Sequence, residues 1–184
     1  FDLRDGKEVP VRGKFMSLAA PVEGVVPHFL RGGKMIFKQD VTGVKSTEDL
    51  NNVFNIIVGL PDFVMGGKAM RAEAVGNILD VPNYSEEVVY KQCTEKNCLM
   101  NVTVACTYGD GTFTTTVTSK SHSSERTENP VEIKEIHLLG APKDFFKGKL
   151  TGKVELDGNE KNISEYKFDE STGVLKILIQ IIWP

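Results

Sequence analysis

The residues that could perform acid–base or metal chemistry are few and far apart. The three histidines, His28, His122 and His137, each stand alone, and none is followed by a second histidine or a cysteine at metal-ligand spacing. Adjacent carboxylates occur only in predicted turns or loop margins, where solvated charge is the expected role: Glu48-Asp49, Glu86-Glu87 and Asp169-Glu170. These side chains predict neither a catalytic group nor a metal site, and no cofactor is expected.

Known catalytic and phosphate-binding motifs are also absent. The sequence has no Gly-x-Ser-x-Gly nucleophile motif and no Gly-x4-Gly-Lys phosphate loop. Arg31-Gly32-Gly33 allows two interpretations, a tight turn between strands or an anion site made of backbone N–H groups. The tight turn is favoured, because paired glycines are commonest where the chain reverses.

Three cysteines lie within fourteen residues, Cys93, Cys98 and Cys106. Their spacing is a poor zinc pattern, whereas a short Cys93–Cys98 disulfide across a loop is possible and would leave Cys106 free. Asn83, Asn101 and Asn162 each begin an Asn-x-Ser/Thr sequon and are glycosylation candidates. Together the sequons and the possible disulfide favour a protein of the secretory pathway, that is, secreted, lysosomal or in the endoplasmic reticulum lumen.

The elements that must hold these residues are short alternating runs separated by turn residues, a pattern typical of antiparallel sheet. Residues 99–108 alternate so that Val102, Val104 and Cys106 share one face, and residues 109–112 predict a tight turn into a threonine-rich strand at 113–118. The last strand places Leu175, Ile177, Ile179 and Ile181 on one face. Further strands are predicted at 14–18, 25–30, 34–37, 54–60, 131–139, 150–156, 162–168 and 174–182, with single helical turns at 47–52 and 144–147. The fold class is therefore all-β, an antiparallel β-sandwich.

Composition limits the partners and the number of domains. The 184 residues correspond to about one domain. The net charge of −3 argues against a nucleic-acid binder, and no apolar run reaches the ~18 residues that a membrane span needs. Residues 1–46 are too short to bury a core of their own, so we expect them to be strands of a second, incomplete sandwich, followed by a whole sandwich at 47–184.

One family shows a matching order of motifs. The matching segments follow one another in the order 1–3, 13–14, 18–22 and 26–36, and then come Gln39 and the apolar run 54–60. The most specific match is Pro27 with Arg31-Gly32-Gly33. This order resembles the region after the catalytic barrel in glycoside hydrolase family 31, the α-glucosidases, where the pattern is Ile-Pro-x-x-x-Arg-Gly-Gly-x-Ile, a Gln and an apolar strand. Residues 130–140 and 166–177 also resemble the family's late strands.

The resemblance implies that this chain has a non-catalytic role in a larger enzyme. The parent would be a multidomain enzyme, and this chain would be the end of its proximal and the whole of its distal C-terminal β-sandwich. Such enzymes hydrolyse terminal α-linked glucose with retention, using two barrel carboxylates about 5–5.5 Å apart. Barrel catalysis takes place at the C-terminal ends of barrel strands, and none of those strands is here, so no catalytic or substrate-binding residue is assigned. The partners would be the catalytic barrel and N-terminal part of the same enzyme, with carbohydrate bound by the parent.

Two further expectations accompany this interpretation. The family usually has a Gly-Glu-Leu-Tyr-x-Asp-Asp-Gly loop where this chain has residues 69–77, which lack the paired aspartates, so a divergent member is expected. The start at Phe1 without a Met or a targeting sequence favours a C-terminal fragment of a longer protein. The alternative is an autonomous carbohydrate-binding or adhesion sandwich, which would need a surface platform of aromatic side chains.

Overall fold

The computed structural model describes residues 1–10, 15, 17–20, 23–39, 41, 43–46, 53–79, 99–121, 131–146, 153–156, 159–162 and 165–183. Within these ranges the structure is all-β, as predicted, and its one short helix is the 3-10 turn η2 (Lys143–Phe146). The strands are β1 (Lys34–Gln39), β2 (Val53–Gly59), β3 (Val64–Gly66), β4 (Ala69–Leu79), β5 (Leu99–Gly109), β6 (Thr112–Ser121), β7 (Val131–Leu139), β8 (Lys153–Leu156), β9 (Asn159–Asn162), β10 (Glu165–Asp169) and β11 (Val174–Trp183).

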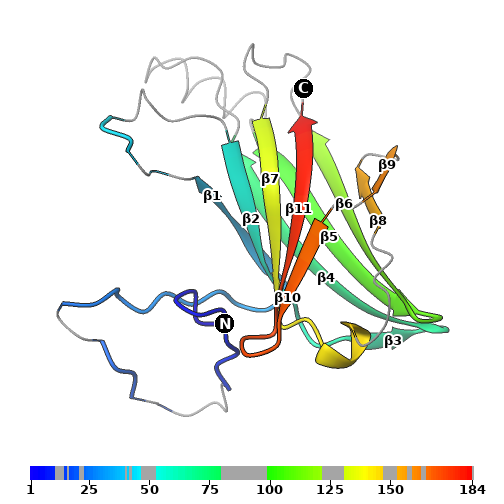
Figure 1. The fold of residues 1–184 in the computed structure, drawn as a ribbon, viewed down its shortest axis with the longest axis horizontal. Helices are drawn as coiled ribbons and strands as arrows, with labels where there is room; N and C mark the ends of the chain where they lie inside the picture. Colours follow the sequence, from blue (N-terminus) through cyan, green and yellow to red (C-terminus); the bar gives the residue numbers. More distant parts are fainter. Residues whose placement is uncertain are drawn as a thin grey trace.

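The strands form one strongly curled sheet (Figure 1) in the order β10-β11-β7-β2-β1-β4-β5-β6-β8-β9, with β3 paired to β4. Most neighbours are antiparallel; β2–β7, β6–β8 and β1–β4 are parallel. The β1–β4 link is short, since its register is a single pair, Lys34 with Val75. We call β10-β11-β7-β2-β1 the first leaf and β4-β5-β6-β8-β9 the second leaf. They meet at this link.

Curling brings the inner faces of the two leaves onto one core. Side chains of the first leaf such as Ile56, Ile136 and Ile177 belong to the same buried cluster as Val104 and Val117 of the second leaf. All five are no more than 1% exposed. Because successive residues of a strand point to opposite faces, this burial follows from the apolar alternation in the sequence. Both leaves therefore depend on one core.

The hairpin predicted at 99–118 is confirmed as β5–β6, turning at Asp110-Gly111, both of which have positive φ. The strand predicted at 131–139 is β7, and the predicted last strand is β11, with Leu175, Ile177 and Ile179 buried on one face. The helical turn predicted at 144–147 corresponds to η2. The helical turn predicted at 47–52 lies outside the described residues.

Three sequence expectations differ from the observed strands. Residues 25–30 are not a strand: Phe29 forms only an isolated antiparallel bridge to Asp2, since the prolines and glycines nearby interrupt regular pairing. Residues 69–77, interpreted as a family loop, belong to the eleven-residue strand β4. The strand β1 comes from residues 1–46 yet pairs along its whole length with β2, so the sheet begins before the predicted boundary at residue 46.

Candidate functional site

The structure places the chemically capable side chains apart from one another. His28 lies in the N-terminal segment, where its backbone carbonyl accepts the Leu3 N–H, and His137 on β7 lies with its Nε2 2.6 Å from Oε2 of Glu135. His122 and the pairs Glu48-Asp49 and Glu86-Glu87 lie outside the described residues, and Asp169-Glu170 is in the exposed hairpin between β10 and β11. In the part of the chain that is described, no group of three or more His, Cys, Asp or Glu side chains could hold a metal ion.

The modification candidates fall on different parts of the chain. Asn101 lies within β5, paired with Lys120 of β6, and Asn162 ends β9. Asn83, Cys93 and Cys98 lie outside the described residues, so the glycosylation and disulfide predictions stay predictions. No helix in the described ranges has the length and apolar character needed to cross a bilayer.

Cys106 is a free, fully buried thiol on the inner face of β5, as its alternation predicted. Burial raises the pKa of this thiol to about 12, because the thiolate would lose its hydration, and the neighbouring Thr115 hydroxyl offsets only part of that effect. Its Sγ lies 3.8 Å from Oγ1 of Thr115. Since the thiolate is the reactive form, Cys106 is a core residue and not a nucleophile.

The Arg31-Gly32-Gly33 segment is a tight turn, the interpretation that the sequence favoured. The N–H of Gly33 donates to the carbonyl of Gly59 at 2.8 Å, and the N–H of Lys34 donates to the carbonyl of Arg31 at 3.2 Å. Gly33 has a φ of +80°, a conformation that suits glycine. With these N–H groups engaged, the turn does not offer them to an anion.

The feature that stands out is how residues 1–30 contact the sheet. A small loop at residues 2–7 is closed by a 2.7 Å hydrogen bond from the Gly6 N–H to the Asp2 carbonyl. The Arg4 guanidinium donates to both Asp2 oxygens, and the Arg4 backbone N–H donates to Oδ1 at 2.9 Å. These hydrogen bonds lower the pKa of the Asp2 carboxyl to about 2. The loop is thus held by a charged pair next to the sheet.

A second, smaller apolar cluster fixes this loop to the outer face of the first leaf. Its buried members are Leu30, Leu139 of β7 and Val174 of β11; Phe1 and Leu3 pack against it. Backbone hydrogen bonds join the two passes of the segment: Leu3 N–H to His28 O and Leu30 N–H to Phe1 O, both 2.9 Å. We call residues 1–7 and 28–31 the anchor.

Beside the anchor lies an open hollow of about 1000 Å³ between the N-terminal segment and the ends of the sheet. Its wall is largely apolar, with the charged side chains Glu8, Arg31 and Asp62 among the lining residues. The apolar lining side chains are Phe1, Val9, Leu18, Phe29, Leu30, Leu60, Pro61, Phe63, Met70 and Pro142. The size suits a bulky apolar insert, and we call it the junction hollow.

Large apolar side chains of the N-terminal segment face solvent. Phe15 is fully exposed, Val25 is 69% exposed and Val26 is 65% exposed; Leu18 and Phe29, which line the hollow, are 41% and 46% exposed. In Figure 1 the segment extends away from the foot of the sheet as an irregular trace. Exposed apolar side chains gathered on one segment mark an interaction surface. The sequence places these residues in predicted strands at 14–18 and 25–30, and only the structure shows that their side chains are exposed.

Comparison with known proteins gives no guide to this surface. No model of a known protein family matches the chain, and no curated protein is significantly similar to it.

Proposed function

We propose that this chain is a non-catalytic β-sandwich region of a retaining α-glucosidase-type glycoside hydrolase, in which it braces the catalytic barrel. The parent would hydrolyse terminal α-linked glucose of oligo- or polysaccharides in the secretory pathway. The motif order at 1–60 supports the family, and the all-β fold agrees with the region expected after the barrel. The observation that carries the bracing role is the N-terminal segment, which is anchored to the sheet while its large apolar side chains stay uncovered.

The energetics favour a large polypeptide partner for this segment. Full burial of an exposed Val, Leu or Phe side chain contributes about 1.5–3 kcal/mol. Several such side chains occur together in the segment, beside a hollow wide enough to receive further side chains. A barrel surface that covered them would be stabilised by this apolar burial. The charged lining side chains, Glu8, Arg31 and Asp62, would give the contact a defined orientation.

The direct test is to purify the native protein from cells that produce it, with an antibody raised against the recombinant chain. We expect the purified material to contain a barrel-sized polypeptide, either continuous with this chain or tightly associated. It should also hydrolyse 4-methylumbelliferyl α-glucoside. A native protein no larger than this chain and without α-glucosidase activity would contradict the proposal. Tight binding of such a monomer to glycogen in affinity electrophoresis would favour the carbohydrate-binding alternative instead.

A matched pair of variants tests the bracing surface itself. Val26 in the N-terminal segment and Val64 on β3 are equally exposed, each 65%. In the full enzyme, Val26→Asp should lower the temperature at which half of the α-glucosidase activity is lost, because a carboxylate would be buried against the barrel. Val64→Asp should leave that temperature unchanged. Equal effects of the two variants would show that the segment is not the bracing surface.

A further inference from the structure

A second hollow, separate from the junction hollow and on the outer face of the first leaf, has the character of a small anion site. Its volume is about 330 Å³, within the range of small-molecule pockets. The anchor loop forms one wall, and the β10–β11 hairpin forms another. The floor is apolar: Leu3, Ile57, Leu139 and Val174. The polar lining side chains are Arg4, Asp5, His137, Lys167, Asp169, Thr172 and Lys176.

Three basic side chains form a row across this face. Lys176 of β11 is directly opposite Lys167 of β10 on one side and His137 of β7 on the other. Directly opposed side chains on one face have Cβ atoms about 4.5–5.5 Å apart, and like charges so placed repel. Lys167 and Lys176 are both exposed, and both line the hollow. The register therefore places two lysines directly opposite each other on one face of the β10–β11 hairpin.

The acidic groups of the hollow are already engaged elsewhere. Asp169 Oδ1 accepts the Ser171 N–H at 2.9 Å and the Ser171 hydroxyl at 2.7 Å, which lowers the pKa of this carboxyl. Asp5 Oδ1 accepts the Lys7 N–H at 3.0 Å. Arg4 is paired with Asp2, and His137 with Glu135. Among the described residues, no carboxylate lies within 4 Å of the ammonium group of Lys167 or of Lys176.

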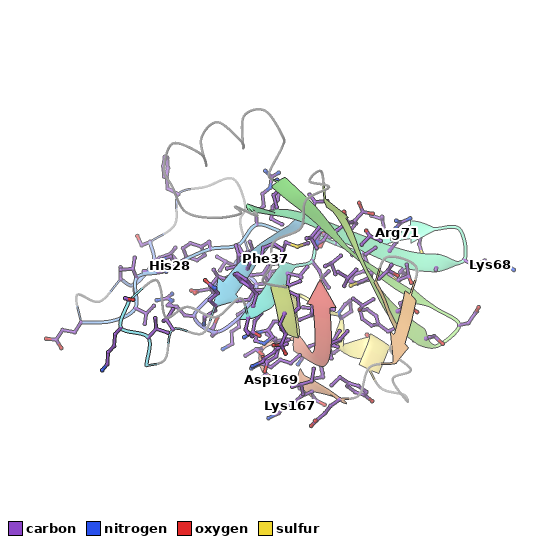
Figure 2. The ribbon with its side chains drawn as sticks, turned by 90° about the horizontal axis from the view of Figure 1, so that it is seen from above. His28, Phe37, Lys68, Arg71, Lys167 and Asp169 are labelled. Carbon is purple, nitrogen blue, oxygen red and sulfur yellow. The ribbon has the colours of Figure 1, made fainter. Side chains whose placement is uncertain are left out.

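We propose that Lys167 and Lys176 bind the tetrahedral oxyanion of a phosphate or sulfate monoester. The oxyanion between the two ammonium groups, a dianion in a phosphate monoester and a monoanion in a sulfate monoester, would replace their mutual repulsion with two charge-assisted contacts. The apolar floor would pack against the carbon skeleton that carries the ester, and the volume admits a group of monosaccharide size. Figure 2 shows Lys167 and Asp169 next to each other at the lower edge of the view and Lys68 and Arg71 at its right, so the site is separate from the β3–β4 end of the second leaf. This inference does not depend on the proposed function.

The test is a titration of the full chain with glucose 6-phosphate at low ionic strength, followed by amide chemical shifts in NMR. We expect saturable shifts in β10, β11 and the anchor loop, no response to glucose, and weakening with added salt. Parallel titrations with glucose 6-sulfate and inorganic phosphate show whether the site prefers a phosphate ester, a sulfate ester or free phosphate. Equal affinity for inorganic phosphate assigns the site to a free oxyanion, and tighter binding of a sugar ester assigns it to the ester; either result supports the oxyanion site.

Paired variants decide whether these lysines form the site. The double variant Lys167→Gln/Lys176→Gln should bind at least tenfold more weakly, whereas Lys38→Gln, which removes an exposed lysine of β1 in the same leaf, should bind like the parent chain. Since the double variant removes a repulsion, its melting temperature should not fall, which separates lost binding from lost folding. No saturable response to any of the three oxyanions, or equal affinity in the double variant, would overturn the proposal.

Discussion

Replacing Gly6 by alanine would test whether the N-terminal segment is held by the anchor. Gly6 has a φ of +76° and lies directly over the outer face of the first leaf. A Cβ at this position would lie 2.5 Å from Cγ2 of Val174 and 3.3 Å from Cδ2 of Leu139. Both contacts are with branched side chains of the small apolar cluster, which have little room to move. The substitution therefore separates the loop from the sheet without removing any existing contact.

Two free-energy costs combine in Gly6→Ala, one from the backbone conformation and one from steric overlap, and a control variant isolates the backbone cost. A left-handed conformation costs a non-glycine residue roughly 1–2 kcal/mol, and overpacking typically costs a further 1–3 kcal/mol. Gly43 also has a positive φ, +79°, but a Cβ added there would have no other atom within 4 Å. Gly43→Ala thus carries the backbone cost alone. The steric cost that remains should increase opening of the anchor about 5- to 150-fold.

The opening can be measured by amide hydrogen exchange. The N–H groups of Leu3 and Leu30 are protected by hydrogen bonds that cross the anchor, to His28 and Phe1. In Gly6→Ala their exchange should accelerate by at least the factor above, because the backbone cost adds to the steric cost, while amides of β7 exchange as before, because the main core is untouched. Unchanged protection at Leu3 and Leu30, or an equal loss in Gly43→Ala, would refute this account of the anchor.

Other parts of the molecule give three further predictions. The carbon NMR signal of the Asp2 carboxyl should titrate with a pKa of about 2, and in Arg4→Gln this pKa should rise toward 3.8. Because the pKa is lower in the folded chain than in the unfolded one, the stabilisation of the anchor by ionised Asp2 is complete above about pH 4 and is lost as the pH falls toward 2. Cys106 should resist iodoacetamide at pH 8 in the folded chain and react once urea unfolds it; rapid native alkylation, read by peptide mass, would contradict its burial. Ile136→Ala in the first leaf should cost about 2–5 kcal/mol and Val117→Ala in the second a smaller amount, each shifting one common thermal transition; two separate transitions would contradict a single core.

The sequence was most informative where burial alternates along a strand. The runs that became β5 and β11 could be assigned with their faces, because one buried side fixes which residues point inward, and the run that became β7 could be assigned as a strand. The prediction that Cys106 points into the core follows from the same alternation. Turn chemistry was equally readable: Asp110-Gly111 and Gly173 take the positive φ that their hairpins require.

Pairing between distant strands could not be predicted, because no local pattern encodes it. The parallel pairing of β2 with β7 joins segments about eighty residues apart. Since β1 pairs with β2, this pairing places β1 in the same sheet as β7. The strand β4 was missed because alanines and a glycine fill its inner positions, a composition with low strand propensity. The paired lysines were missed for a related reason: Lys167 and Lys176 become neighbours only through the β10–β11 register.

The segment before Arg31 has too little buried surface to account for its own order. Ordering a backbone costs about 1–2 kcal/mol per residue, and the buried side chains among its described residues are Asp2 and Leu30. Beyond the anchor, the same segment leaves Phe15, Val25 and Val26 largely in water. In the proposed function, contacts with the catalytic barrel would bury these side chains, and the junction hollow lies where those contacts would form. This exposed apolar surface, more than any motif, supports the proposal of a partner polypeptide at this end of the sheet.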